Sequence, residues 1–285
     1  MKPDPNPLPR EKLNAILSLL ADDDEEVISS LAENLKKMGE RELADLQEAW
    51  KKSPRGNSVP PAFNLAKRWR AVDEFCELAA GPGLPELETG VFLISTWGRP
   101  DLPILRAGLK LDAYAAHLMD QDACRRPIAI PLEAAGVLCK YLFAEIGFKG
   151  AEKNYSDPDN SFLAAVLESG LGIPISLSVL AILVAKRMRL ELTPIGSPGH
   201  FMVAVKEPGK SRETYIDCFA GGNFLKEAQA RKLVGRIPPG MDPFPEVDSR
   251  EVLARTLRNL HTSYRTLEDD RRISEIERML AAISI

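Results

Sequence analysis

The sequence predicts an α+β protein in which helices predominate. Apolar residues recur at helical spacing through residues 9–50 and again through residues 249–285. Residues 201–206 and 214–219 are instead short runs of β-favouring residues, and the turn-forming sequence Glu207-Pro208-Gly209-Lys210 separates them. We therefore expect one antiparallel strand pair within an otherwise helical chain.

Composition and charge are those of an ordinary globular protein. Of the 285 residues, 45% are hydrophobic and 27% are charged, and the formal net charge is -4. Because the basic residues are scattered, the sequence predicts no nucleic-acid partner. The longest largely apolar run, Ile173–Ala185, is shorter than the roughly 18 residues of a membrane span, and the first residues lack the apolar segment of a secretory signal. We expect a cytoplasmic protein that binds no membrane.

The four cysteines do not form a recognisable metal or disulfide pattern. Cys76, Cys124, Cys139 and Cys218 lie far apart, without a C-x-x-C pair or a histidine at metal-ligand spacing. Isolated cysteines of this kind are usually small buried apolar residues. The sequence therefore predicts no metal site, no disulfide framework and no cofactor.

The first part of the chain predicts paired helices that precede a linker. The acidic run Asp22–Glu26 separates two amphipathic stretches and suits a helix start, where carboxylates cap free backbone N–H groups. The second stretch ends at Gly39, and a third apolar stripe follows it. This pattern is similar to one HEAT-type repeat. Lys51–Pro61, with three prolines and one glycine, is the clearest linker.

These patterns divide the chain into four expected segments. Residues 1–60 form the HEAT-like helical segment, and residues 61–136 form a helical segment that packs on the core. The core spans residues 137–232 and contains the strand pair. Residues 233–285 form a C-terminal helical segment, similar to a TPR hairpin.

Three motifs in the core carry a resemblance to a known family. They are NYSDPDNSFLAAVLESGLGIPISLSVLAILVAKRMRL at 154–190, SPGHFMVAV at 197–205 and TYIDCFAGGNFL at 214–225. In this order they resemble the transglutaminase-like core of the bacterial SirB family. The resemblance implies a papain/transglutaminase-like fold, in which the N-terminus of a buried helix faces a small antiparallel sheet.

The resemblance also implies a catalytic triad from which the nucleophile is missing. Active relatives place a cysteine at the start of the buried helix, a histidine as base and an aspartate that orients the imidazole. His200 and Asp217 match the last two positions, whereas Pro174 stands at the cysteine position. Proline cannot attack a carbonyl, but it suits the first turn of a helix, where its missing N–H would have no partner.

Other residues remain open as substitutes for the cysteine. Ser178 lies on the same helix face as Pro174 but about 6 Å further along the helix, and Ser176 is rotated by about 200° from that face. Cys218 adjoins Asp217, but neighbouring strand residues point to opposite faces of a sheet. Asn160 matches the family motif, and we expect its amide to brace the cleft.

Two functions follow from these residues. The favoured one is a non-catalytic binding or scaffold module for a protein or peptide. The alternative is an acyl-transfer hydrolase of the amidase, esterase or protease type, with Ser178 or Ser176 as nucleophile and His200 and Asp217 in their usual roles. Thiol chemistry at Cys218 ranks third. The sequence does not indicate whether the protein is a monomer or an oligomer.

Overall fold

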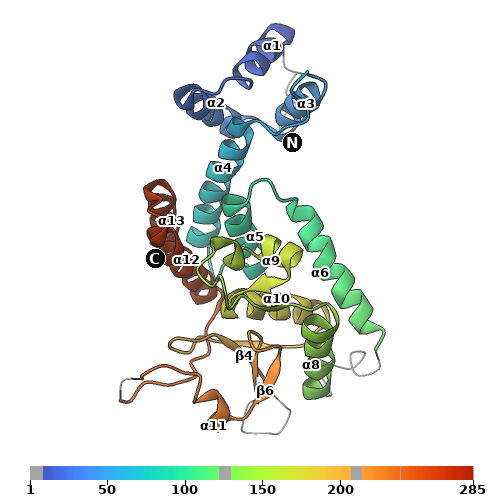
Figure 1. Cartoon of the computed structure of the whole chain (residues 1–285), viewed down its shortest axis with the longest axis vertical. Coiled ribbons are helices and arrows are strands. Elements are labelled where there is room, and N and C mark those ends of the chain that lie inside the picture. The colour runs from blue at the N-terminus through green and yellow to red at the C-terminus, as the bar shows by residue number, and fades with distance from the viewer. Residues whose placement is uncertain (1–8, 122–129, 207–213, 238, 285) are drawn as a thin grey trace. The chain divides into compact units, whose positions relative to one another are not determined.

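The chain consists of two compact units in the computed structural model, which describes residues 9–121, 130–206, 214–237 and 239–284 (Figure 1). The units divide between Asp73 and Glu74, within the helix α4 (Pro61–Ala80). The four segments expected from the sequence remain a prediction.

The first unit is helical and has its own apolar core. Its helices are α1 (Arg10–Leu19), α2 (Glu25–Lys37), α3 (Glu40–Lys51) and the first part of α4. Asp24 caps α2, because its side chain accepts from the N–H groups of Glu26 and Val27. The acidic run is therefore a helix cap, as predicted. Buried core residues include Leu31, Leu35, Leu46, Trp50 and Phe63. The similarity to a HEAT repeat is untested.

The second unit contains most of the helices. They are α5 (Leu87–Gly98), α6 (Ile104–Met119), α8 (Pro131–Cys139), α9 (Leu163–Ser169), α10 (Pro174–Arg187), α11 (Glu227–Ala230), α12 (Ser249–Thr266) and α13 (Asp270–Ile283). A π-helix, η1 (Lys140–Glu145), continues α8, and the 3-10 helix η2 (Pro158–Ser161) precedes α9. The predicted helical C-terminus is confirmed, since α12 and α13 pack on each other.

A small antiparallel sheet completes this unit within the described residues. Its order is β3 (Thr193–Ile195), β4 (Met202–Val205), β5 (Thr214–Asp217) and β6 (Asn223–Leu225). The predicted strand pair is confirmed as β4 and β5, with Val203 opposite Ile216, although its connecting turn lies outside the described residues. The edge strands escaped prediction because three residues are too few to show alternation. Two further short strands, β1 (Lys149–Gly150) and β2 (Leu171–Gly172), pair in parallel.

Helix α10 lies at the centre of the second unit. It contacts α6, α8 and α9 as well as β4, and in Figure 1 it lies between α9 and β4. Eleven of its fourteen residues are buried, which explains the continuous apolar run in the sequence. The opposite face of the sheet packs Met202, Ala204 and Tyr215 against Ala230 and Phe244. The start of α10 is thus fixed by packing along the whole helix.

None of the helices that the structure describes is both long enough and apolar enough to cross a membrane. The expected cytoplasmic location remains a prediction.

Candidate functional site

A cleft of about 400 Å³ opens at the start of α10. The loop before β4 and one face of α12 supply its other walls. The residues that line it are Tyr155, Pro174, Ile175, Gly199, His200, Phe201, Arg255 and Asn259. The fold therefore brings Pro174 and His200, which lie apart in the sequence, into one cleft.

Ser176 builds the start of α10 and does not line the cleft. Its Oγ accepts a hydrogen bond from Ile173 N at 3.0 Å and donates to the backbone oxygen of Asn160 at 2.6 Å. A Cβ at Gly172 would lie 2.7 Å from this Oγ, so a glycine lets the preceding strand pass close to the cap. Ser176 is buried and its hydroxyl is occupied, which makes it a capping residue.

Asn160 braces the loop that leads to this helix start. Its side-chain amide donates to the backbone oxygen of Asn154 at 2.6 Å, and its own backbone oxygen accepts from Ser176. The side chain is buried and does not line the cleft. Asn160 thus holds the loop 154–160 against the helix start and does not offer its amide to the cleft.

His200 and Asp217 lie in contact at the ends of the two central strands. His200 Nε2 is 3.1 Å from Asp217 Oδ1, and both side chains are largely buried. Despite the short distance, the relative orientation of the two groups does not form a hydrogen bond. The same Oδ1 accepts from Phe219 N at 3.1 Å and Ala220 N at 3.2 Å. The carboxylate is therefore held mainly by the turn that follows β5.

Ser178 lies inside the protein, away from the cleft. It is completely buried, and its Oγ has no hydrogen-bond partner of standard geometry among the described residues. The hydroxyl is nevertheless near the Cys218 thiol and acts to lower the pKa of that thiol. Ser178 lies one helical turn beyond Pro174, and this places it at the interface between α10 and the sheet.

The buried thiols are not set up for nucleophilic chemistry. Burial raises the pKa of Cys218 well above its usual value, and nearby Cys139 raises it further. Burial also raises the pKa of Cys139 to about 12. Both groups are therefore protonated at neutral pH, whereas a thiolate is the reactive form. Across the described ranges, no three His, Cys, Asp or Glu side chains gather where they could hold a metal ion.

Arg255 is the principal cleft residue that sequence reasoning missed. Its Nη2 donates to the backbone oxygens of Ser197 at 2.8 Å and His200 at 2.9 Å. Its guanidinium carbon lies 5.4 Å from the centre of the Phe201 ring. Burial lowers the pKa of Arg255 from its usual value. The one available signal was a basic residue between Ala254 and Thr256 on the buried side of an amphipathic helix.

Tyr155 and Asn259 add polar groups to the same cleft. Tyr155 is half exposed, and burial raises the pKa of its hydroxyl while the nearby Arg255 opposes that shift. Asn259 follows Arg255 by four residues and therefore shares its face of α12. No hydrogen bond within the described residues occupies either side chain. Both groups are available to a ligand.

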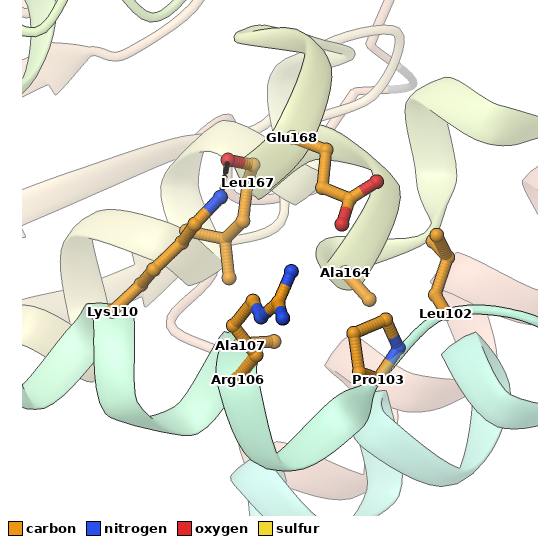
Figure 2. A pocket seen from close by; sticks show the side chains of 8 residues that line it. All are labelled: Leu102, Pro103, Arg106, Ala107, Lys110, Ala164, Leu167 and Glu168. Atoms are coloured by element: carbon orange, nitrogen blue, oxygen red, sulfur yellow. Dashed lines mark hydrogen bonds between the residues drawn. The ribbon is translucent and has the colours of Figure 1, made fainter.

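A second hollow, of about 200 Å³, lies between α6 and α9 (Figure 2). Lys110 reaches across it from α6 and donates to the backbone oxygen of Leu167 at 2.9 Å. Figure 2 also shows Arg106 and Glu168 at its edge, on the two opposing helices. This hollow is half the size of the cleft and contains none of the predicted site residues, so we assign it a packing role.

Comparisons with known proteins agree with this architecture. A family model described as the transglutaminase-like superfamily matches residues 107–258, which is more than half of the chain. A UPF0162 protein of Xylella fastidiosa (strain 9a5c) is 36% identical over 193 residues, covering 64% of this chain and 65% of the relative. The chain therefore spans a little under two thirds of that relative's length.

More distant relatives match a shorter part of the chain. F-box only protein 21 of Mus musculus is 29% identical over 126 residues, or 42% of this chain and 20% of the relative. A UPF0162 protein of Vibrio cholerae is 28% identical over 122 residues, or 41% of this chain and 45% of the relative. No solved structure matches. On the strength of the family match over residues 107–258, this chain belongs to the transglutaminase-like superfamily.

Proposed function

We propose that this protein is a non-catalytic, SirB-type member of the superfamily whose cleft binds a protein or peptide without transforming it. The observation that carries the proposal is the presence of Pro174 in the cleft beside His200. The resemblance puts the nucleophile at this position, and proline has no atom that can attack a carbonyl.

The other hydroxyl and thiol groups do not replace the missing sulfur. A nucleophile must come within about 3.2 Å of its base, or reach it through one water. Ser176 is engaged in capping α10, and Ser178 is buried away from the cleft. Tyr155 does line the cleft, but its raised pKa keeps the hydroxyl protonated at neutral pH. The hydrolase alternative therefore lacks supporting geometry.

His200 and Asp217 each make structural contacts that do not depend on catalysis. Asp217 terminates β5 by accepting two backbone N–H groups, and the backbone oxygen of His200 anchors Arg255. A protein that has lost its nucleophile would keep Asp217, because its removal would leave two backbone N–H groups without that partner. The anchor at position 200 is a backbone oxygen and does not depend on the imidazole.

The helical segments on either side of the core extend the proposal. We propose that residues 1–60 and 233–285 act as HEAT-like and TPR-like flanks, since stacked helix pairs commonly present surfaces that bind peptides. The cytoplasmic location belongs to the same proposal.

Covalent probes test the proposal directly. Purified protein is treated with a fluorophosphonate and, separately, with iodoacetamide at neutral pH, and modified residues are located by mass spectrometry. We expect no modification that depends on His200, so wild type and His200→Ala should give the same labelling pattern. Labelling of a serine, or turnover of an ester or amide, that disappears in His200→Ala would overturn the proposal.

A further inference from the structure

We propose that the cleft beside Pro174 binds a carboxylate group, which Arg255 holds together with Tyr155 and Asn259. This inference rests on the proposed function and names the ligand chemistry of the same cleft.

The first support is the partly buried positive charge of Arg255, which forms no salt bridge within the described residues. Glu251, which lies one turn earlier on α12, forms its salt bridge with Arg258, and its charge only partly offsets the burial that lowers the pKa of Arg255. A cation that loses hydration without a counter-ion is unfavourable, and an anion in the cleft would offset that loss.

The second support is the way in which the guanidinium is held. In the described part of the chain, only Nη2 of Arg255 donates hydrogen bonds, to the carbonyls of Ser197 and His200. These bonds and the Phe201 ring fix the group, and no residue in the described ranges bonds its Nε or Nη1. The two N–H groups of Nη1 can each donate a charge-assisted hydrogen bond to a carboxylate oxygen. Because the group is already ordered, little entropy is lost on binding.

The third support is the character of the neighbouring side chains. Tyr155 and Asn259 place a hydroxyl and an amide in the cleft, and both can donate to an anion. No Asp or Glu is among the described residues that line it. The first turn of α10, at Pro174 and Ile175, adds the positive end of the helix dipole. The whole lining therefore favours negative charge.

The size of the cleft limits what the carboxylate can be attached to. The part of the cleft that a ligand could fill is about 130 Å³, which is below the usual range for small-molecule sites, so the cleft admits only a small group. It suits a free organic acid or the last residue of a peptide with its terminal carboxylate. These two sources share the same recognised group, and the experiment below separates them.

The experiment is a calorimetric titration of the full chain with N-acetylglycine, N-acetylglycinamide and inorganic phosphate. We expect N-acetylglycine to bind and its neutral amide to bind at least about 10-fold more weakly, because charge-assisted hydrogen bonds carry the contact. Phosphate, which arginine also pairs with, tests whether the cleft prefers a carboxylate over another anion. A short peptide with a free C-terminus is compared with the same peptide amidated. Tighter binding of the free peptide than of N-acetylglycine identifies a peptide terminus as the source, and equal affinity identifies a free acid.

Matched variants locate the site. Arg255→Met should weaken N-acetylglycine binding about 10-fold or more, whereas Arg265→Met, at an exposed position of the same helix, should leave it unchanged. Arg255 also anchors two carbonyls, so its loss can disturb folding. Tyr155→Phe and Asn259→Ala keep those anchors. Each should weaken binding by about 3- to 10-fold without changing thermal stability.

Several results would overturn the inference. These are equal binding of acid and amide, preferential binding of phosphate, no binding up to about 10 mM, and affinity unaffected by all three cleft variants. If N-acetylglycine fails to bind and no His200-dependent labelling occurs, the carboxylate site is wrong while the non-catalytic proposal stands. His200-dependent labelling would instead overturn the proposed function itself.

Discussion

Arg255 Nη2 donates to the backbone oxygen of His200 at 2.9 Å, which ties the imidazole-bearing loop to helix α12. The family's histidine position is therefore held by a residue far along the chain. The same guanidinium also holds Ser197, so the loop 197–200 is fixed at both ends. This arrangement supports a cleft whose shape exists before any ligand arrives.

Replacing Pro174 with cysteine should create a reactive thiol. The new side chain would open α10 in the cleft that contains His200, where an adjacent base and the helix dipole favour the thiolate. We expect its pKa to fall below about 7.5. The measurement is the pH dependence of iodoacetamide labelling at residue 174, followed by mass spectrometry. The control is Pro174→Cys with His200→Ala, and identical pH profiles in the two variants would contradict the prediction.

The two serines of α10 should respond oppositely to alanine substitution. Ser176→Ala removes the shorter hydrogen bonds of Ile173 N and of the Asn160 carbonyl and leaves the 3.3 Å bond between these two groups, so we expect a loss of about 1 kcal/mol in the free energy of unfolding. Ser178→Ala removes a buried hydroxyl without a hydrogen bond of standard geometry, so stability should stay the same or rise. Urea unfolding measures both. Equal destabilisation of the two variants would show that this assignment is wrong.

Asp217 should tolerate asparagine better than alanine. Asparagine keeps an oxygen that can accept from Phe219 N and Ala220 N, whereas alanine leaves both N–H groups without that partner. We expect Asp217→Ala to lose about 1–3 kcal/mol and Asp217→Asn clearly less. Chemical denaturation compares them. If asparagine costs as much as alanine, the contact with His200 matters more than the turn.

Stability should fall in alkaline solution through the buried thiol of Cys139. Its pKa rises from 9.0 to about 12 on folding, so the folded state keeps a proton that the unfolded state releases. The contribution is complete below pH 9 and is lost as pH rises from about 9 towards 12, by up to about 1.4 kcal/mol per pH unit. Urea unfolding of wild type and Cys139→Ala at several pH values measures this. Parallel pH dependences would contradict it.

Local chemistry explains which parts of the structure the sequence predicts. The Asp24 cap, the start of α10 and the β4–β5 pair depend on neighbouring residues, so their patterns are visible in one dimension. The family motifs assign Pro174 and His200 to one site, and both residues line one cleft in the structure.

The remaining site residues have no such local pattern. Arg255 reaches the loop of His200 across 55 residues, and its role depends on how α12 packs. Helical spacing put Ser178 on the face of Pro174, but it did not show that the sheet covers this part of the face. Tertiary packing therefore decides which polar side chains reach the cleft.

The cap formed by Ser176 has an evolutionary consequence. Ser176 and the Asn160 carbonyl hold the first turn of α10 through bonds that do not involve the side chain of residue 174. A mutation at position 174 can therefore exchange a cysteine for a proline while the capping bonds remain. If the proposed function is right, active and inactive members of the superfamily can differ at this one side chain.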